Sequence, residues 1–92
     1  MGYDYRDKVI VITGGAGGIG SHLARDFSAK GAILVLLDIS KAKLDAVINS
    51  LSGQMHRAIA LDLTDRSAIS QAISEIETSF SSLNTLLKFL LT

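Results

Sequence analysis

A run of four β-branched residues that ends in a cluster of glycines most constrains how this chain can fold. Residues 9–12, Val-Ile-Val-Ile, are apolar without alternation, which predicts a short strand buried on both faces of a parallel sheet. The next eight residues are Thr-Gly-Gly-Ala-Gly-Gly-Ile-Gly, from Thr13 to Gly20. From Ile19 onward, apolar residues recur at helical spacing, at Leu23, Ala24 and Phe27. The pattern predicts a strand over 8–13, a glycine turn and a helix over 18–30.

This turn has the properties of a phosphate-binding site. Glycine leaves no side chain in the way of a ligand and allows positive φ, and the first turn of a helix offers backbone N–H groups to an anion. We expect the amides at Gly14, Gly18 and Gly20 to hold a diphosphate. The alternative is an ordinary glycine-rich turn that binds nothing.

The rest of the chain alternates predicted strands and helices. Gly31 ends the first helix, and the apolar run Ala32–Leu37 predicts a second buried strand. A helix capped by Ser40 and ended by Gly53 follows. Residues 55–61 predict a more polar strand, and residues 83–91 a fourth strand. Thr64 is expected to cap the helix between them, whose core face would comprise Ile69, Ala72, Ile73, Ile76 and Phe80.

Four strands separated by three helices predict an α/β fold with a doubly wound parallel sheet, because parallel neighbours need crossover connections. We expect the strand order 3-2-1-4, with the first two helices on one face and the third on the other. With 92 residues, the chain fits one domain spanning 1–92.

Composition excludes several classes of function. Nine basic residues balance nine acidic ones, which argues against a surface that binds nucleic acid. There is no cysteine, so thiolate chemistry and disulfides are excluded. The first residues carry acids and a short apolar run, unlike a signal peptide, and Leu86 to Leu91 is too short to span a membrane. A cytoplasmic location is therefore expected.

Asp38 is the strongest candidate for a cofactor contact outside the turn. It ends the second strand, 18 positions after Gly20, near the spacing at which a carboxylate meets the ribose hydroxyls of a dinucleotide. Such a carboxylate repels a 2′-phosphate, and neither Gly17 nor Ile39 supplies a basic side chain to offset it. The sequence favours NAD over NADP. The alternative is that Asp38 is only a turn residue ahead of the Ser40 cap.

With these motifs in place, the chain resembles the N-terminal part of a short-chain dehydrogenase/reductase, over residues 8 to about 87. Residues 13–20 fit that family's Thr-Gly-xxx-Gly-x-Gly turn, and Asp62-Leu63-Thr64-Asp65 resembles its Asp-Leu/Val-Thr-Asp stretch. The resemblance implies a Rossmann-like fold and a contact from Asp62 to the adenine amino group. The cofactor-binding residues implied together are Gly14, Ala16, Gly17, Gly18, Ile19, Gly20, Asp38, Ile39, Asp62 and Leu63.

The chain then departs from the family pattern. Where the family continues its fourth strand into Asn-Asn-Ala-Gly, this chain reads Lys88-Phe89-Leu90-Leu91. The family's Tyr-xxx-Lys pair is absent, because Tyr3 and Tyr5 are the only tyrosines and neither has a lysine four places on. In the family that tyrosine is the general acid and base. We therefore expect an incomplete dinucleotide-binding domain, truncated relative to the family, with no catalytic residue.

His22 and His56 are expected in surface or structural roles, with no metal site, and Lys88 is expected to be a solvated edge residue. An uncovered sheet face and the edge of the fourth strand predict self-association. Two other hypotheses stay open, namely a non-catalytic NAD-binding module that needs a partner and an S-adenosylmethionine-binding methyltransferase fragment.

Overall fold

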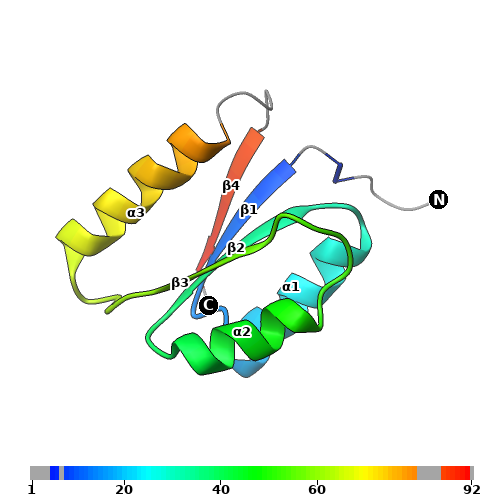
Figure 1. The fold of residues 1–92 in the computed structure, drawn as a ribbon, viewed down its shortest axis with the longest axis horizontal. Coiled ribbons are helices and arrows are strands. Elements are labelled where there is room, and N and C mark those ends of the chain that lie inside the picture. Colours follow the sequence, from blue (N-terminus) through cyan, green and yellow to red (C-terminus); the bar gives the residue numbers. More distant parts are fainter. Residues whose placement is uncertain (1–4, 7, 81–85, 92) are drawn as a thin grey trace.

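The computed structural model describes residues 5, 6 and 8–80, and the backbone of 86–91. Strands and helices alternate along it (Figure 1). The elements in order are β1 (Lys8–Thr13), α1 (Gly18–Ala29), β2 (Ile33–Asp38), α2 (Lys41–Asn49), β3 (Arg57–Ala60), α3 (Arg66–Ser79) and β4 (Leu86–Leu91).

The strands form one parallel sheet in the order β3-β2-β1-β4. Val9 of β1 pairs with Ile33 of β2 on one side and with Leu87 of β4 on the other. Because all strands run the same way, the carboxyl ends of β1, β2 and β3 meet at one edge of the sheet, and the segments that follow them lie together there. β3 and β4 are the outer strands.

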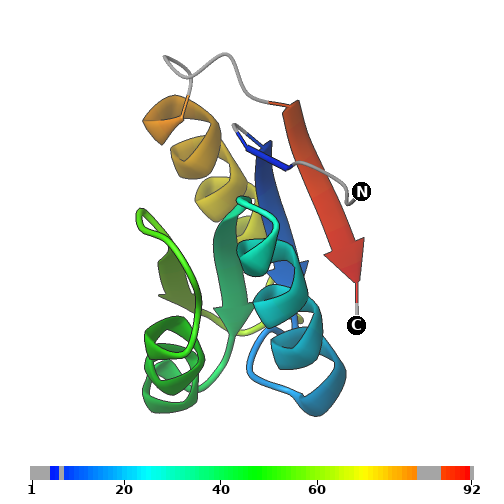
Figure 2. The ribbon, with the colours of Figure 1, turned by 90° about the vertical axis from the view of Figure 1, so that its right-hand side faces the viewer.

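Alternate residues of the two central strands point to opposite faces, and each face has its own cover (Figures 1 and 2). On one face α1 and α2 pack against the sheet through Ala24, Leu44 and Val47. On the other, α3 packs through Ile76 and ends at the buried Phe80. The α/β class and the two-sided helix arrangement predicted from the sequence are confirmed. The sheet residues involved are Ile10, Ile12, Leu34 and Leu36 on the first face and Val9, Val11, Val35 and Leu37 on the second.

Helix caps agree with the sequence in one case and correct it in another. The Ser40 hydroxyl accepts from the Lys43 amide at 3.3 Å, as an N-cap does. The expectation that Thr64 caps α3 is wrong, because Asp65 is the N-cap and accepts from the Ala68 amide at 3.1 Å.

Several element ends also differ from the prediction. α2 ends at Asn49, and Gly53, expected to end it, lies in the following loop with φ +85°. β3 is shorter than expected because Met55 has φ +74°, which takes it out of the extended region. Ile19 is 72% exposed, so it does not begin the core face of α1. The expectations for residues 81–85 and for the side chain of Lys88 lie outside the described residues.

Candidate dinucleotide-binding site

The glycine turn between β1 and α1 is anchored to the end of β2. The amides of Gly14 and Gly15 both donate to the Leu37 carbonyl, at 2.8 and 3.2 Å. Gly14 has φ +72°, a conformation that favours glycine, and its carbonyl accepts from the Gly17 amide at 3.0 Å. The expectation that Gly14 offers its amide to a diphosphate is therefore wrong, because that amide is already engaged within the fold.

The other glycines serve two different purposes. A Cβ atom at Gly20 would collide with the Gly14 carbonyl oxygen, and one at Gly15 would lie 2.8 Å from the Cβ of Leu36. These two positions need glycine for close packing of the turn. At Gly18 a Cβ would meet nothing within 4 Å, so the space beside the start of α1 is open.

Three backbone donors remain at the start of α1. The N–H groups of Gly18, Ile19 and Gly20 have no acceptor among the described residues, whereas the Ser21 amide donates to the Gly17 carbonyl at 2.8 Å. No side chain caps the helix at Gly17, and its first turn contains no acidic residue. Unpaired amides and the positive end of a helix dipole, next to open space, are the features that favour anion binding at a helix N-terminus.

Asp38 faces the turn from the end of β2. Its Oδ2 accepts from the Ala16 amide at 3.0 Å, and its Oδ1 accepts from its neighbour's amide, that of Ile39, at 2.7 Å. The residue is half-buried. A carboxylate offers about four acceptor positions, so each oxygen keeps capacity for a further donor such as a hydroxyl.

Asp62 lies at the same edge of the sheet, just beyond β3. The Leu61 amide donates to the Asp38 carbonyl at 2.9 Å, which holds the end of β3 against the end of β2. Asp62 Oδ1 accepts from the Thr64 amide at 2.9 Å and from the Thr64 hydroxyl at 2.7 Å. These bonds, the amide first, lower the pKa of the Asp62 carboxyl below its ordinary value, so it is ionised at neutral pH.

All ten residues singled out as cofactor contacts thus lie in segments at the carboxyl edge of the sheet. Six are in the turn and the start of α1, two end or follow β2, and two follow β3. The sequence did not predict that the backbone carbonyl of Leu37 holds the glycine turn by accepting two hydrogen bonds from it. A backbone carbonyl leaves no signal in residue types, so this role was visible only in the structure.

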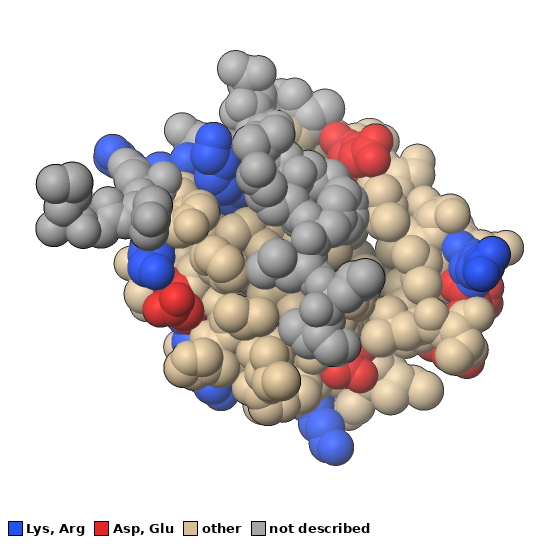
Figure 3. Space-filling model, turned by 180° about the vertical axis from the view of Figure 1, so that it is seen from behind, with Lys and Arg blue, Asp and Glu red and all other residues tan. Residues whose placement is uncertain are grey.

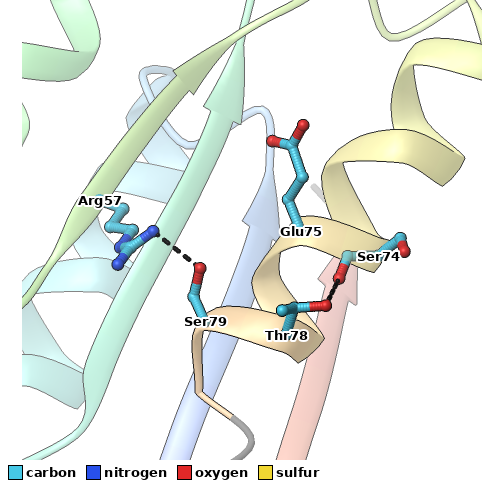
Figure 4. A pocket seen from close by; sticks show the side chains of 5 residues that line it. All are labelled: Arg57, Ser74, Glu75, Thr78 and Ser79. Atoms are coloured by element: carbon cyan, nitrogen blue, oxygen red, sulfur yellow. Dashed lines mark hydrogen bonds between the residues drawn. The ribbon is translucent and has the colours of Figure 1, made fainter.

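A cavity among the described residues lies elsewhere. It has a volume of about 390 Å³ and is lined by exposed residues at the start of β3 and the end of α3, where Arg57 donates to the Ser79 hydroxyl at 3.1 Å (Figure 4). The start of β3 is at the amino edge of the sheet, opposite the glycine turn. This cavity is therefore separate from the candidate site.

On the face opposite to that of Figure 1, acidic and basic side chains are dispersed (Figure 3). Within the described ranges, no group of three or more histidine, cysteine or carboxylate side chains is placed to hold a metal ion. None of the three helices in the described part of the chain has the length and apolar character needed to cross a membrane.

The two histidines occupy different elements of the fold. His22 is exposed on α1. His56 precedes β3, where its ring bonds to the Leu34 amide and the Ser52 carbonyl, which is the structural role expected of it.

Comparison with known proteins identifies the family of this chain. A family model described as short chain dehydrogenase matches residues 8–88. Meso-2,3-butanediol dehydrogenase of Serratia marcescens is 37% identical over 83 residues, covering 90% of this chain and 33% of that protein. The NAD-dependent glycerol dehydrogenase of Listeria innocua is 39% identical over 75 residues, covering 82% of this chain and 29% of that protein.

Solved structures show the same likeness. The short-chain dehydrogenase/reductase of Brucella melitensis described as a glucose/ribitol dehydrogenase has a TM-score of 0.79 and 31% identity, covering 87% of this chain and 33% of that one. The L-sorbose reductase of Gluconobacter frateurii, solved with NADPH and L-sorbose, has a TM-score of 0.79 and 29% identity, covering 87% and 32%. This chain spans about a third of the length of these relatives. It belongs to the short-chain dehydrogenase family.

Proposed function

We propose that this chain is the dinucleotide-binding part of an NAD-dependent oxidoreductase that acts on alcohol or carbonyl groups. The observation that supports this most is the pairing of three unengaged amides at Gly18, Ile19 and Gly20 with the Asp38 carboxylate beside them. Amides at a helix start suit a diphosphate, and a carboxylate at the end of the neighbouring strand suits a ribose diol.

The remaining contacts follow from this placement. Ile19 and Ile39 are 72% and 71% exposed, although large apolar side chains are usually covered. A bound dinucleotide would cover them, with its adenine near Ile39 and the half-buried Leu63, and Asp62 would accept from the adenine amino group. Gly17 and Ala16 would border the diphosphate. Gly14 would act by shaping the turn.

We propose NAD as the preferred cofactor. A 2′-phosphate would place a second negative charge beside Asp38, and neither Gly17 nor Ile39 offers a cation to offset it. Among the relatives, one is described as NAD-dependent and another was solved with NADPH, so the chain's own residues carry this preference.

Bound nicotinamide would supply the chemistry of hydride exchange, and this chain's residues would bind and orient the cofactor. The family's Tyr-xxx-Lys pair has no counterpart here, since Tyr3 and Tyr5 are followed four places on by Asp7 and Val9. We therefore propose that the chain alone does not oxidise alcohols or reduce ketones. Measurable turnover by the pure protein would contradict this part of the proposal.

Self-association and a cytoplasmic location also belong to this proposal. β4 is an outer strand of the sheet, and its sequence is apolar apart from Lys88. A strand with one open edge offers backbone groups to a second copy. Sedimentation velocity should show species larger than a monomer, whereas a single monomeric species across a range of concentrations would contradict this.

Isothermal calorimetry with NAD, NADP and S-adenosylmethionine tests the proposed ligand. We expect saturable binding of NAD, weaker binding of NADP and no heat from S-adenosylmethionine. Gly18→Val should abolish NAD binding, because its side chain would occupy the open space beside the amides. Binding of S-adenosylmethionine in preference to NAD would favour the methyltransferase hypothesis instead. If the chain binds NAD but shows no turnover of alcohols or ketones, alone or with a partner protein, the hypothesis of a non-catalytic NAD-binding module is supported.

A further inference from the structure

Arg57, the first residue of β3, is an exposed arginine whose guanidinium is held in place. It donates to the Ser79 hydroxyl at 3.1 Å and lies 5.1 Å from the centre of the Phe80 ring, which is buried. Neither contact neutralises its charge, and none of the ion pairs among the described residues includes it. A guanidinium has five N–H donors, so donors remain for an anion.

The cavity beside Arg57 is one of two hollows between β3 and α3. The first, of about 390 Å³, has Arg57 on its β3 side and Glu75 on its α3 side (Figure 4). The second, of about 210 Å³, is lined by the residues from Ile59 to Leu61 of β3 and the loop after it, and by Ala72 among others of α3. Glu75 lines both hollows, so they adjoin and form one groove along the strand.

The groove runs beside the open edge of the sheet. β3 is an outer strand, so within the described part of the chain half of its backbone groups have no strand to pair with. The Leu61 amide donates to the Asp38 carbonyl of β2, and backbone groups alternate in direction along a strand. The N–H and C=O groups of Ala58 and Ala60 therefore face away from the sheet, and their small side chains leave room for another strand to approach.

We propose that this groove binds the carboxyl terminus of an extended peptide, which adds to β3 as an antiparallel strand. In an antiparallel pair, the last residue of the peptide lies beside the first residue of β3, so its carboxylate meets Arg57. The backbone of the peptide bonds to Ala58 and Ala60. Side chains on the α3 side of the added strand enter the groove, and an apolar one near the start of the peptide fills the second hollow.

The charges of the groove favour a carboxylate over a phosphate. A carboxylate carries one negative charge and can accept two parallel bonds from a guanidinium. A phosphate group carries nearly two negative charges at neutral pH, and the Glu75 carboxylate in the same hollow repels them. Glu75 has no partner in the ion pairs of the described ranges, so it suits a basic side chain in the middle of the peptide.

Calorimetry with two synthetic peptides tests the groove. The probe is N-acetylated Val-Ala-Lys-Ala-Val with a free carboxylate, and the comparison is the same peptide with its carboxyl end amidated. We expect saturable binding of the free acid and binding of the amidated peptide weaker by roughly tenfold, because the charged bonds to Arg57 are lost. Arg57→Gln should bind both peptides as weakly as the wild type binds the amidated one.

Arg25→Gln is the matched control. Arg25 is also exposed and also bonded to a serine hydroxyl, that of Ser50 at 3.1 Å, but it lies on α1, on the other face of the sheet. This variant should bind the free acid as the wild type does. Equal affinities of the wild type for the two peptides, or no saturable binding at millimolar peptide, would overturn the proposal.

Amide chemical shifts locate the peptide on the wild-type protein, without any variant. The free acid should shift the ¹⁵N-labelled amides of Ala58 and Ala60 most. Shifts confined to the start of α1 would place the carboxylate at the helix instead and would overturn the proposal. Inorganic phosphate that displaced the peptide at equal concentration would overturn the choice of a carboxylate.

Discussion

The carboxylate of Asp38 accepts a hydrogen bond from the backbone amide of Ala16 at 3.0 Å, so the end of β2 and the glycine turn hold each other in place. The residue proposed to contact a ribose is thus also part of the support of the diphosphate site. The Leu37 carbonyl, which accepts from Gly14 and Gly15, provides the second support. Hydrogen bonds within the fold therefore position the turn.

Asp38→Ala should lower both stability and NAD affinity. It removes the acceptor of the Ala16 and Ile39 amides, and hydrogen bonds to a charged group contribute about 1.5–3 kcal/mol, so we expect a loss of about 1–3 kcal/mol in urea unfolding. Asp38→Asn keeps one acceptor oxygen and should lose less. Asp26→Ala is the control, because its exposed pair with Lys30 should contribute less than about 1 kcal/mol. Equal effects of Asp38→Ala and Asp26→Ala would contradict this role.

Alanine at Gly20 should destabilise the fold, whereas alanine at Gly18 should change its stability little. The new Cβ at Gly20 would meet the Gly14 carbonyl oxygen, a backbone atom that cannot move without distorting the turn, so we expect a loss of about 1–3 kcal/mol. At Gly18 the space is open, and stability should stay within about 1 kcal/mol of the wild type. Thermal melts of the two variants side by side measure this, and a stable Gly20→Ala would show that the turn is looser than the structure indicates.

Asp62 should contribute to stability only where it is ionised. Its bonds with Thr64 lower its pKa in the folded chain, so this contribution is present above the ordinary titration range near pH 3.9 and is lost as the pH falls through the lowered pKa. Melting temperatures of the wild type should therefore fall more steeply on acidification than those of Asp62→Asn. Thr64→Val, which removes the hydroxyl bond and keeps the amide bond, should lie between them. If the melting temperatures of all three proteins fell equally on acidification, this role of Asp62 would be contradicted.

The cap of α3 provides a test of the corrected assignment. Asp65→Ala removes the acceptor of the Ala68 amide and should cost about 1 kcal/mol, as loss of an N-cap commonly does. Ser40→Ala at the start of α2 should cost a similar amount. Thr64→Ala should leave the helix N-terminus capped. Chemical unfolding followed by circular dichroism measures these losses. A larger loss in Thr64→Ala than in Asp65→Ala would contradict the assignment of Asp65 as the cap.

Elements that depend on local pattern were predictable from the sequence. The unbroken apolar runs gave β1 and β2, because strands buried on both faces have no polar alternation. The cap of α2 at Ser40 was also predictable from residue type and position. The cap of α3 was not, because Thr64 and Asp65 are both good caps and only the backbone path decides between them.

Features that depend on tertiary contacts could not be predicted from the sequence. The amide of Gly14 could not be excluded from the site without knowing that it donates to Leu37. Ile19 fits the helical period of α1, yet it lies beside the open turn and is exposed. The packing need for glycine at position 20 also became visible only once α1 was placed against the turn.

Amide chemical shifts of the ¹⁵N-labelled protein during an NAD titration test whether the start of α1 binds the diphosphate. We predict that the largest shifts fall on Gly18, Ile19 and Gly20, that they saturate, and that they are weakened in Asp38→Ala. Unchanged shifts at these three amides in millimolar NAD, or saturable shifts confined to another part of the chain, would contradict it.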